Sequence, residues 1–173
     1  MYLKKDDLVL RQATPNDAEQ LCAWWGDGKI MAHAGFPNGL NTDINILRNR
    51  LSQNRENSKT LIIEINSNPV GEMSFRIVDG TSEIGIKICD FSYHEKGYGT
   101  KALKMLISYL FDEMNVDKIV LDTNLTNTRA QHVYENLGFK KVAIKMNVWT
   151  NQLGELQSSV DYELTPNLVN CSN

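Results

Sequence analysis

Apolar positions along the chain follow two different periods, which separate expected strands from expected helices. Ile84, Ile86 and Ile88 occur at every second position, a pattern typical of a strand with one buried face. After Gly99 the apolar residues recur at 3.6-residue spacing and predict a long amphipathic helix; they are Leu103, Leu106, Ile107, Leu110, Phe111 and Met114. Read along the whole chain, the pattern predicts strands at 8–12, 60–65, 70–78, 83–89, 118–122, 140–149 and 158–164, and helices at 14–25, from the cap at Thr42, at 99–115 and at 127–137.

The order of these elements indicates the fold class. Turn residues at 66–69 and 79–80 join the strands 60–65, 70–78 and 83–89 into an antiparallel meander, and helices and strands alternate after it. We therefore expect an α/β fold with a mixed central sheet that is antiparallel in its first half and has helices on both faces. The chain of 173 residues is expected to form a single domain over 1–173, with a loose polar tail at 165–173.

Composition narrows the classes of function. Hydrophobic residues make up 42% and charged residues 23% of the chain, as in ordinary soluble domains. A formal net charge of -3 with dispersed lysines argues against nucleic acid, and no apolar run is long enough for a membrane span or a signal peptide, so we expect a cytoplasmic protein. Three cysteines at unrelated spacings predict no disulfide framework, and the three histidines show no ligand spacing, so no metal is expected.

A glycine-rich run, 96–100, lies where the amphipathic helix is expected to begin. Gly97 and Gly99 allow a ligand to approach the backbone without meeting a Cβ. Free amides at the start of the helix and the positive end of its dipole favour a phosphate there. The sequence therefore predicts a pyrophosphate-binding loop.

Two common pyrophosphate-binding motifs fit this run poorly. A Walker loop needs Gly-Lys followed by Ser or Thr, which the chain lacks. Gly97, Gly99 and Ala102 do match G-x-G-x-x-A, with Asp122 twenty residues further on. In a dinucleotide-binding unit, however, the glycine turn directly follows its strand, whereas residues 90–96 intervene here, and a second mononucleotide-binding half is missing.

A second motif follows the next expected strand. It reads N-x-R-A-x-x-x-Y-E-x-x-G-F and comprises Asn127, Arg129, Ala130, Tyr134, Glu135, Gly138 and Phe139. Together with the glycine run, it resembles the GNAT superfamily of acyl-CoA-dependent N-acetyltransferases, in both order and spacing. Within that superfamily, the arrangement of the N-terminal half and the closing hairpin looks most like the ribosomal-protein N-terminal acetyltransferases. The resemblance implies strands that splay apart at the cofactor.

The same resemblance implies a site for acetyl-CoA as cosubstrate. Backbone groups at the end of the last meander strand would pair with the pantetheine arm, and amides of the glycine run would hold the pyrophosphate. Asn127 would cap its helix and, with Ala130, contact the pantetheine. The cofactor residues expected in this way are Lys87, Ile88, Cys89, Glu95, Lys96, Gly97, Tyr98, Gly99, Thr100, Asn127 and Ala130. His94 and Glu95 depart from the family pattern, and Glu95 is expected to face solvent because its charge would repel a pyrophosphate.

Two residues are expected to carry the chemistry. By resemblance, Tyr134 lies beside the thioester sulfur and protonates the leaving thiolate; the alternative is a core aromatic. Asp122 is the candidate base for the amine, with Glu72 and Glu83 as rivals. Cys89 could instead act as a nucleophile, although a lone cysteine without a paired histidine more often serves packing.

The acceptor amine is expected between the two early helices and the closing hairpin. Candidate substrate contacts are Trp25, His33, Phe36, Glu72 and Glu83, and Trp24 and Trp149 are further candidates for the walls. The expected reaction is acetyl transfer to a primary amine, by direct attack, with a protein N-terminus or similar amine as acceptor. The alternatives are a small polyamine or aminoglycoside, or a non-catalytic acyl-CoA-binding module. The protein is expected to be a monomer or homodimer without a membrane partner.

Overall fold

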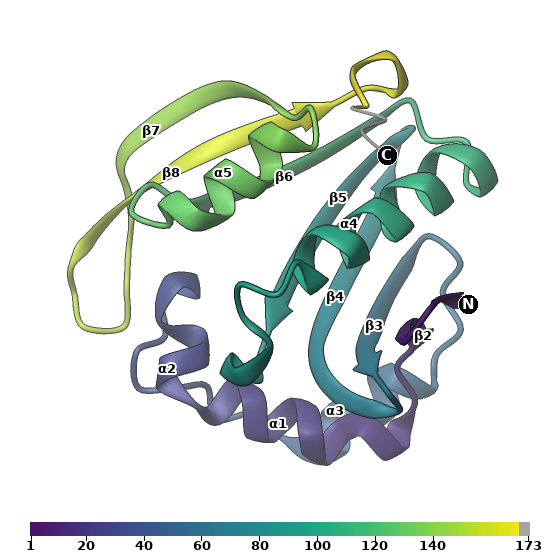
Figure 1. Ribbon diagram of the computed structural model, residues 1–173. Coiled ribbons are helices and arrows are strands. Elements are labelled where there is room, and N and C mark those ends of the chain that lie inside the picture. The colour runs from purple at the N-terminus through teal and green to yellow at the C-terminus, as the bar shows by residue number, and fades with distance from the viewer. Residues whose placement is uncertain (170–173) are drawn as a thin grey trace.

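The computed structural model describes residues 1–169 as one eight-stranded sheet with helices on both faces (Figure 1). The strand order is β1-β2-β3-β4-β5-β6-β8-β7, and the strands are β1 (Tyr2–Lys5), β2 (Leu8–Gln12), β3 (Ser58–Ile65), β4 (Asn68–Val78), β5 (Thr81–Ile88), β6 (Lys118–Asn124), β7 (Lys140–Thr150) and β8 (Leu156–Leu164). All neighbouring pairs are antiparallel except β5 and β6. The predicted fold class is confirmed.

The helices cover both faces of the sheet, because successive side chains along each strand point to opposite faces. They are α1 (Ala18–Gly26), α2 (Gly28–Met31), α3 (Ile44–Ser52), α4 (Tyr98–Ser108) and α5 (Thr128–Asn136). Leu61 and Ile63 of β3 pack into the large core under α4 and α5, whereas Ile62 between them packs with α1 and α3 on the opposite face. In Figure 1, α4 and α5 cross the face of the sheet that is turned toward the viewer.

Three local features differ from the sequence prediction. A short strand, β1, pairs with β2 at the edge of the sheet and was not expected, because only Leu3 of its residues is strongly apolar. The helix expected over 99–115 is α4 followed by a π-helical turn, Tyr109–Glu113, in which Met114 N donates to Tyr109 O (3.1 Å). The segment 165–169, expected to be loose, contains a 3₁₀ turn and packs Leu168 against the core, while 170–173 lie outside the described residues.

A bulge in β4 lies beside the end of β5, where the chain continues toward the glycine run. Pro69 and Gly71 pair with neighbouring residues of β3, which leaves Val70 between them without a partner on that strand. The Val70 carbonyl turns to β5 and accepts hydrogen bonds from Cys89 N (2.8 Å) and Asp90 N (2.9 Å). A Cβ at Gly71 would collide with the Lys87 carbonyl, so the close approach requires glycine.

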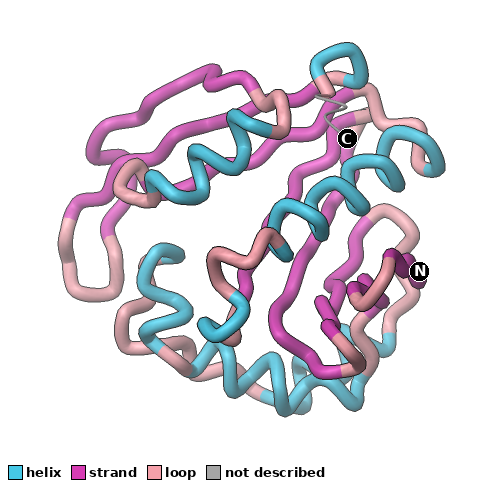
Figure 2. The backbone as a smooth tube through the Cα atoms, in the orientation of Figure 1, coloured by secondary structure: helices cyan, strands magenta, loops and turns pink. Residues whose placement is uncertain are grey.

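The loop of the β7–β8 hairpin rests on the segment after α2, as Figure 2 shows at the lower left. Gln152 N donates to Gly35 O (2.8 Å), and Gln152 Oε1 accepts from Asn38 N (2.8 Å). The Trp149 ring covers Gly35 so closely that a side chain there would clash. The closing hairpin is thus joined to the segment that follows α2.

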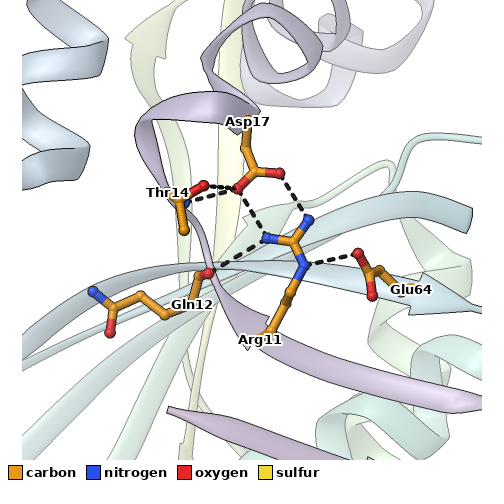
Figure 3. Close-up of polar contacts among 5 residues, drawn as sticks. All are labelled: Arg11, Gln12, Thr14, Asp17 and Glu64. Carbon is orange, nitrogen blue, oxygen red and sulfur yellow. Dashed lines mark hydrogen bonds and ion pairs between the residues drawn. The ribbon is translucent and has the colours of Figure 1, made fainter. Parts of the chain in front are cut away.

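Arg11 ties the start of the first helical segment to the sheet (Figure 3). Its guanidinium binds Asp17 through two bonds, of 2.8 and 2.9 Å, and donates from Nε to Glu64 Oε1 at 2.7 Å. Thr14 N and Oγ1 also donate to Asp17. Partial burial works against the ionised form, but the hydrogen bonds from Arg11 and Thr14 outweigh it and lower the pKa of Asp17.

We expect Asp17→Asn to lower the free energy of unfolding at pH 7 by about 1–2 kcal/mol, because a charge-assisted bidentate pair is lost. The folded-state pKa of Asp17 is depressed, so this stabilisation is present above the unfolded pKa of about 3.9 and is lost as the pH falls through the folded pKa. Urea titrations of both proteins between pH 7 and pH 3 should therefore converge at low pH.

Arg48→Gln is the matched control for this experiment, since it breaks the exposed Arg48–Glu19 pair. Its expected effect is below about 0.5 kcal/mol. Equal losses for the two variants at pH 7 would contradict the role assigned to the Arg11 network.

Candidate active site

The first cleft opens where β5 and β6 separate. These strands pair only over Thr81–Glu83 and Lys118–Val120 and then diverge, as Figure 1 shows. The cleft at this divergence has a volume of about 1040 Å³. Its walls come from the end of β5, the glycine run, the first turn of α4, the end of β6 and α5.

The glycine run supplies free backbone donors to this cleft. Gly97 has φ 78° and serves as the N-cap of α4, and the space where its Cβ would lie is open. The first intrahelical bond is donated by Lys101 N to Gly97 O (3.0 Å), so the amides of Tyr98, Gly99 and Thr100 precede it. Three amides at the positive end of an eleven-residue helix are suited to bind a pyrophosphate.

Glu95 and Lys96 directly precede the first glycine of this loop. Glu95 has a left-handed backbone (φ 60°) and an exposed side chain at the rim of the first cleft. Lys96 points elsewhere, with its Nζ 5.6 Å from the centre of the Tyr93 ring, and does not line the cleft. Anion binding here therefore depends on backbone amides rather than on Lys96.

His94, which departs from the family pattern, bridges the mouth of the first cleft. Its Nε2 donates to Ile88 O (2.8 Å), and its Nδ1 accepts from the guanidinium of Arg129 (3.1 Å). The carbonyl has no hydrogen to give and Arg129 has no lone pair, so the two contacts together require the neutral Nε2–H tautomer. The bridge joins residues 35 positions apart, and sequence analysis did not find it.

Helix α5 brings Tyr134 to the inner end of the first cleft. Asn127 caps the helix by accepting from Ala130 N (3.3 Å), and both residues line the cleft. The Tyr134 ring is buried between Phe139 and Tyr162, with ring centres 5.9 and 5.7 Å away. Burial, and then the charge of Asp122, raise the pKa of Tyr134 to about 12, so the phenol remains a proton donor at neutral pH.

A second cleft, with a volume of about 770 Å³, lies between the sheet and α1 and α3. It shares Ile84, Gly85, Lys87 and Asp122 with the first cleft, so the two clefts meet where β5 and β6 diverge. The middle of its floor carries only small side chains, because Gly85 on β5 lies opposite Ser74 on β4.

Asp122 stands at this junction among other carboxylates. It lies opposite Asp161 on β8 and near Glu83 on β5. Partial burial, followed by the charges of Asp161 and Glu83, raises the pKa of Asp122, and Lys145 opposes the shift. Lys145 itself pairs with Asp161 at 2.5 Å. A carboxylate with a raised pKa at a cleft junction is suited to accept a proton.

Glu72 is buried in the second cleft and already has two partners. Its Oε1 accepts from Trp25 Nε1 (2.6 Å) and lies 3.4 Å from Lys87 Nζ. The opposite charge of Lys87 and the indole bond hold this carboxylate in place. Glu72 is therefore better suited to orient Trp25 than to exchange protons.

The structure brings most of the expected site residues together. Trp25, Glu72 and Glu83 line the second cleft, His33 and Trp149 line the first, and Asp122 lines both. Phe36 lines neither cleft, and Trp24 is a core residue of the cluster around α1. Lining residues that the sequence analysis did not single out include Lys29, Ile30, Arg50, Arg55, Lys59, Arg76 and Gly85.

Cys89 is a correction to the expected cofactor contacts. Its amide is used by Val70 O, and its side chain is buried with α1 and α3, outside the first cleft. Burial, and then the charge of Glu72, raise the pKa of Cys89 to about 12. A buried, protonated thiol is a poor nucleophile.

Comparison with known proteins identifies the family to which this arrangement belongs. A family model described as an acetyltransferase (GNAT) domain matches residues 7–140. The chain belongs to the GNAT acetyltransferase family. Enzymes of this family use acetyl-CoA, and the chain is an acetyl-CoA-dependent N-acetyltransferase.

Individual relatives agree in sequence and in structure. An uncharacterized N-acetyltransferase p20 of Bacillus licheniformis is 24% identical over 149 residues, which cover 80% of this chain and 82% of that protein. The fold is similar to a spermidine N-acetyltransferase from Vibrio cholerae in complex with CoA and spermine, with a TM-score of 0.83, 17% identity and coverage of 95% and 98% of the two chains. It is also similar to a ribosomal L7/L12 α-N-protein acetyltransferase in complex with coenzyme A, with a TM-score of 0.82, 16% identity and the same coverage.

Residues 1–169 contain no group of three or more His, Cys, Asp or Glu side chains arranged to hold a metal ion. In the same range, no helix has the length and apolar character needed to cross a bilayer.

Proposed function

We propose that this GNAT enzyme acetylates the primary amine of a protein N-terminus or a similar acceptor by direct attack on acetyl-CoA in a ternary complex. The observation that carries the proposal is the meeting of two clefts at Asp122, whose charge acts on Tyr134 in the first cleft. The first cleft offers amides for a pyrophosphate and a wall for the pantetheine arm. The second cleft gives an acceptor separate access to the same point, so both substrates can be bound at once.

Each proton has a residue suited to carry it. Asp122, with its raised pKa, takes a proton from the bound ammonium, directly or through a water, and leaves the amine lone pair free. The amine nitrogen forms a bond to the thioester carbonyl carbon, and the carbon–sulfur bond breaks. Tyr134 donates its phenolic proton to the departing thiolate. The buried Cys89 takes no part, which supports direct attack over an acetyl-enzyme.

A small polyamine or an aminoglycoside is the alternative acceptor. The second cleft is open enough to admit either, and the similar spermidine N-acetyltransferase binds spermine. A panel of free amines and peptides, assayed side by side with acetyl-CoA, separates these acceptor classes.

The role of Asp122 predicts a specific pH dependence. In the wild type, kcat/KM for a fixed amine should rise through an ionisation above the ordinary aspartate pKa, because Asp122 accepts a proton only when ionised. Asp122→Asn should remove this limb and lower the plateau by about 10²-fold. If Asp122 only holds the ammonium, its loss would raise KM and leave the acidic limb in place.

Asp161→Asn tests what raises the pKa of Asp122, and Asp161 itself lines neither cleft. It removes a negative charge beside Asp122 and frees Lys145, and both changes lower the pKa of Asp122. The acidic limb should therefore move to lower pH. If Glu83→Gln removes the limb while Asp122→Asn keeps it, Glu83 is the base.

A further inference from the structure

In the second cleft, negative and positive side chains line different parts of the wall. Glu83 on β5 and Asp122 on β6 stand on the side where the two clefts meet. Within residues 1–169, neither carboxylate forms an ion pair. Glu83 lies directly opposite Arg76 in register, yet the two do not pair. Glu83 and Asp122 are therefore the two carboxylates left without an ion pair at this junction, whereas Lys87 beside them is held by Glu72.

Cations line the part of the cleft formed by α3, the loop after it, β3 and β4, and Arg76 on β4 lies directly opposite Glu83. Arg50 comes from α3, Arg55 from the loop after it and Lys59 from β3, and all three line the second cleft. Arg50 lies over the Trp25 ring, 5.6 Å from its centre. Arg55 donates to Gln53 Oε1, and Lys59 donates to Gln12, Asn54 and the Arg55 carbonyl, so their described partners are neutral. Together with Arg76, they form a positive wall that none of the carboxylates in residues 1–169 neutralises by an ion pair.

The separation between the two sides indicates the length of the acceptor. From Lys59 on β3 to Asp122 on β6 there are three strand intervals, or about 14 Å at a spacing of about 4.8 Å, and from Arg76 on β4 to Asp122 there are two, or about 10 Å. A peptide advances about 3.3 Å per residue, so the side chains of its second to fourth residues reach the cations when the amine lies at Asp122. A polyamine would place a second cation against the positive wall.

Building on the proposed acetyl transfer, we propose that the second cleft selects the amino terminus of a peptide with acidic side chains at its second to fourth positions. The terminal ammonium lies between Glu83 and Asp122, where its proton can be removed. The acidic side chains lie against Arg50, Arg55, Lys59 and Arg76. The polar arrangement of the cleft thus fixes the direction in which the acceptor binds.

The test compares peptides that differ only in charge and position. Acetylation rates are measured for peptides beginning Ser-Glu-Glu-Glu, Ser-Gln-Gln-Gln and Ser-Lys-Lys-Lys, with the same neutral continuation, and for one with the three glutamates at positions seven to nine. We expect the first peptide to exceed the glutamine peptide about tenfold in kcat/KM at low salt, chiefly through KM, and the advantage to shrink as salt is added. Glutamates at positions seven to nine should give no advantage. Free glutamate and spermidine form two further arms.

The double variant Arg55→Gln with Arg76→Gln should reduce the acidic-to-glutamine ratio to about two, whereas Arg55→Lys, which keeps the charge, should preserve it. Arg48→Gln is the matched control, because Arg48 is on α3 but lies outside the second cleft; it should leave the ratio unchanged. Equal rates for the three peptides, or a preference for the lysine peptide or spermidine, would overturn the charge selection while acetyl transfer itself stands. If no peptide or amine in the panel is acetylated, the proposed function fails instead.

Discussion

Gly99→Asp is expected to abolish coenzyme A binding and to leave the fold intact. Gly99 lies in the first turn of α4 with its amide ahead of the first intrahelical bond. An aspartate there places a negative charge where the pyrophosphate is expected, so that electrostatic repulsion and the loss of space act together. The helix itself tolerates the change, because an acidic residue in its first turn is favourable.

Gly99→Ala separates charge from size in this experiment. A Cβ at Gly99 would lie 3.8 Å from Cγ1 of Ile88, an ordinary contact, so alanine should fit and weaken binding only modestly. Isothermal titration with coenzyme A on both variants, with circular dichroism to confirm folding, gives the comparison. Wild-type affinity in a folded Gly99→Asp variant would refute the assignment of the glycine run to the pyrophosphate.

Tyr134→Phe should lower kcat on the order of 10²-fold with little change in coenzyme A affinity, the usual scale for loss of a general acid. The ring remains between Phe139 and Tyr162, so packing and stability should be preserved. Single-turnover measurements report the rate of the chemical step separately from product release.

Tyr109→Phe provides the matched control, because Tyr109 contacts Phe75 and lies outside both clefts. Its turnover should stay within about twofold of the wild type. The same small effect for Tyr134→Phe in single turnover would mean that Tyr134 is a packing residue and that water protonates the thiolate.

Features set by neighbouring residues in the chain were predictable from the sequence. The apolar stripe from Leu103 to Leu110 locates α4, since helix periodicity is a local property. The fold class and the family resemblance were both inferred from the order of the elements. That order is strand, glycine run, helix, strand and tyrosine-bearing helix. The cap of α5 at Asn127 was likewise expected from the motif.

Features that depend on distant contacts were not predictable. The His94–Arg129 bridge and the Trp25–Glu72 bond join residues 35 and 47 positions apart, and no local pattern marks either pair. Strand alternation places the Cys89 side chain on the α1 and α3 face, but the hydrogen bond of its amide to Val70 in the bulge of β4 is a distant contact that no local pattern marks. The positive wall of the second cleft comes from α3, a loop and two strands, so its charges come together only in the folded chain.

The central claim is that both substrates meet at the junction of the two clefts and react without an acetyl-enzyme. Mass spectrometry after incubation with acetyl-CoA, first alone and then with an amine-bearing peptide, tests it most directly. We predict no acetylated protein in the first reaction, and in the second one acetylated terminal amine for each coenzyme A thiol released. Accumulation of an enzyme acetylated at Cys89, or tight binding of acetyl-CoA with no transfer to any amine, would contradict the account.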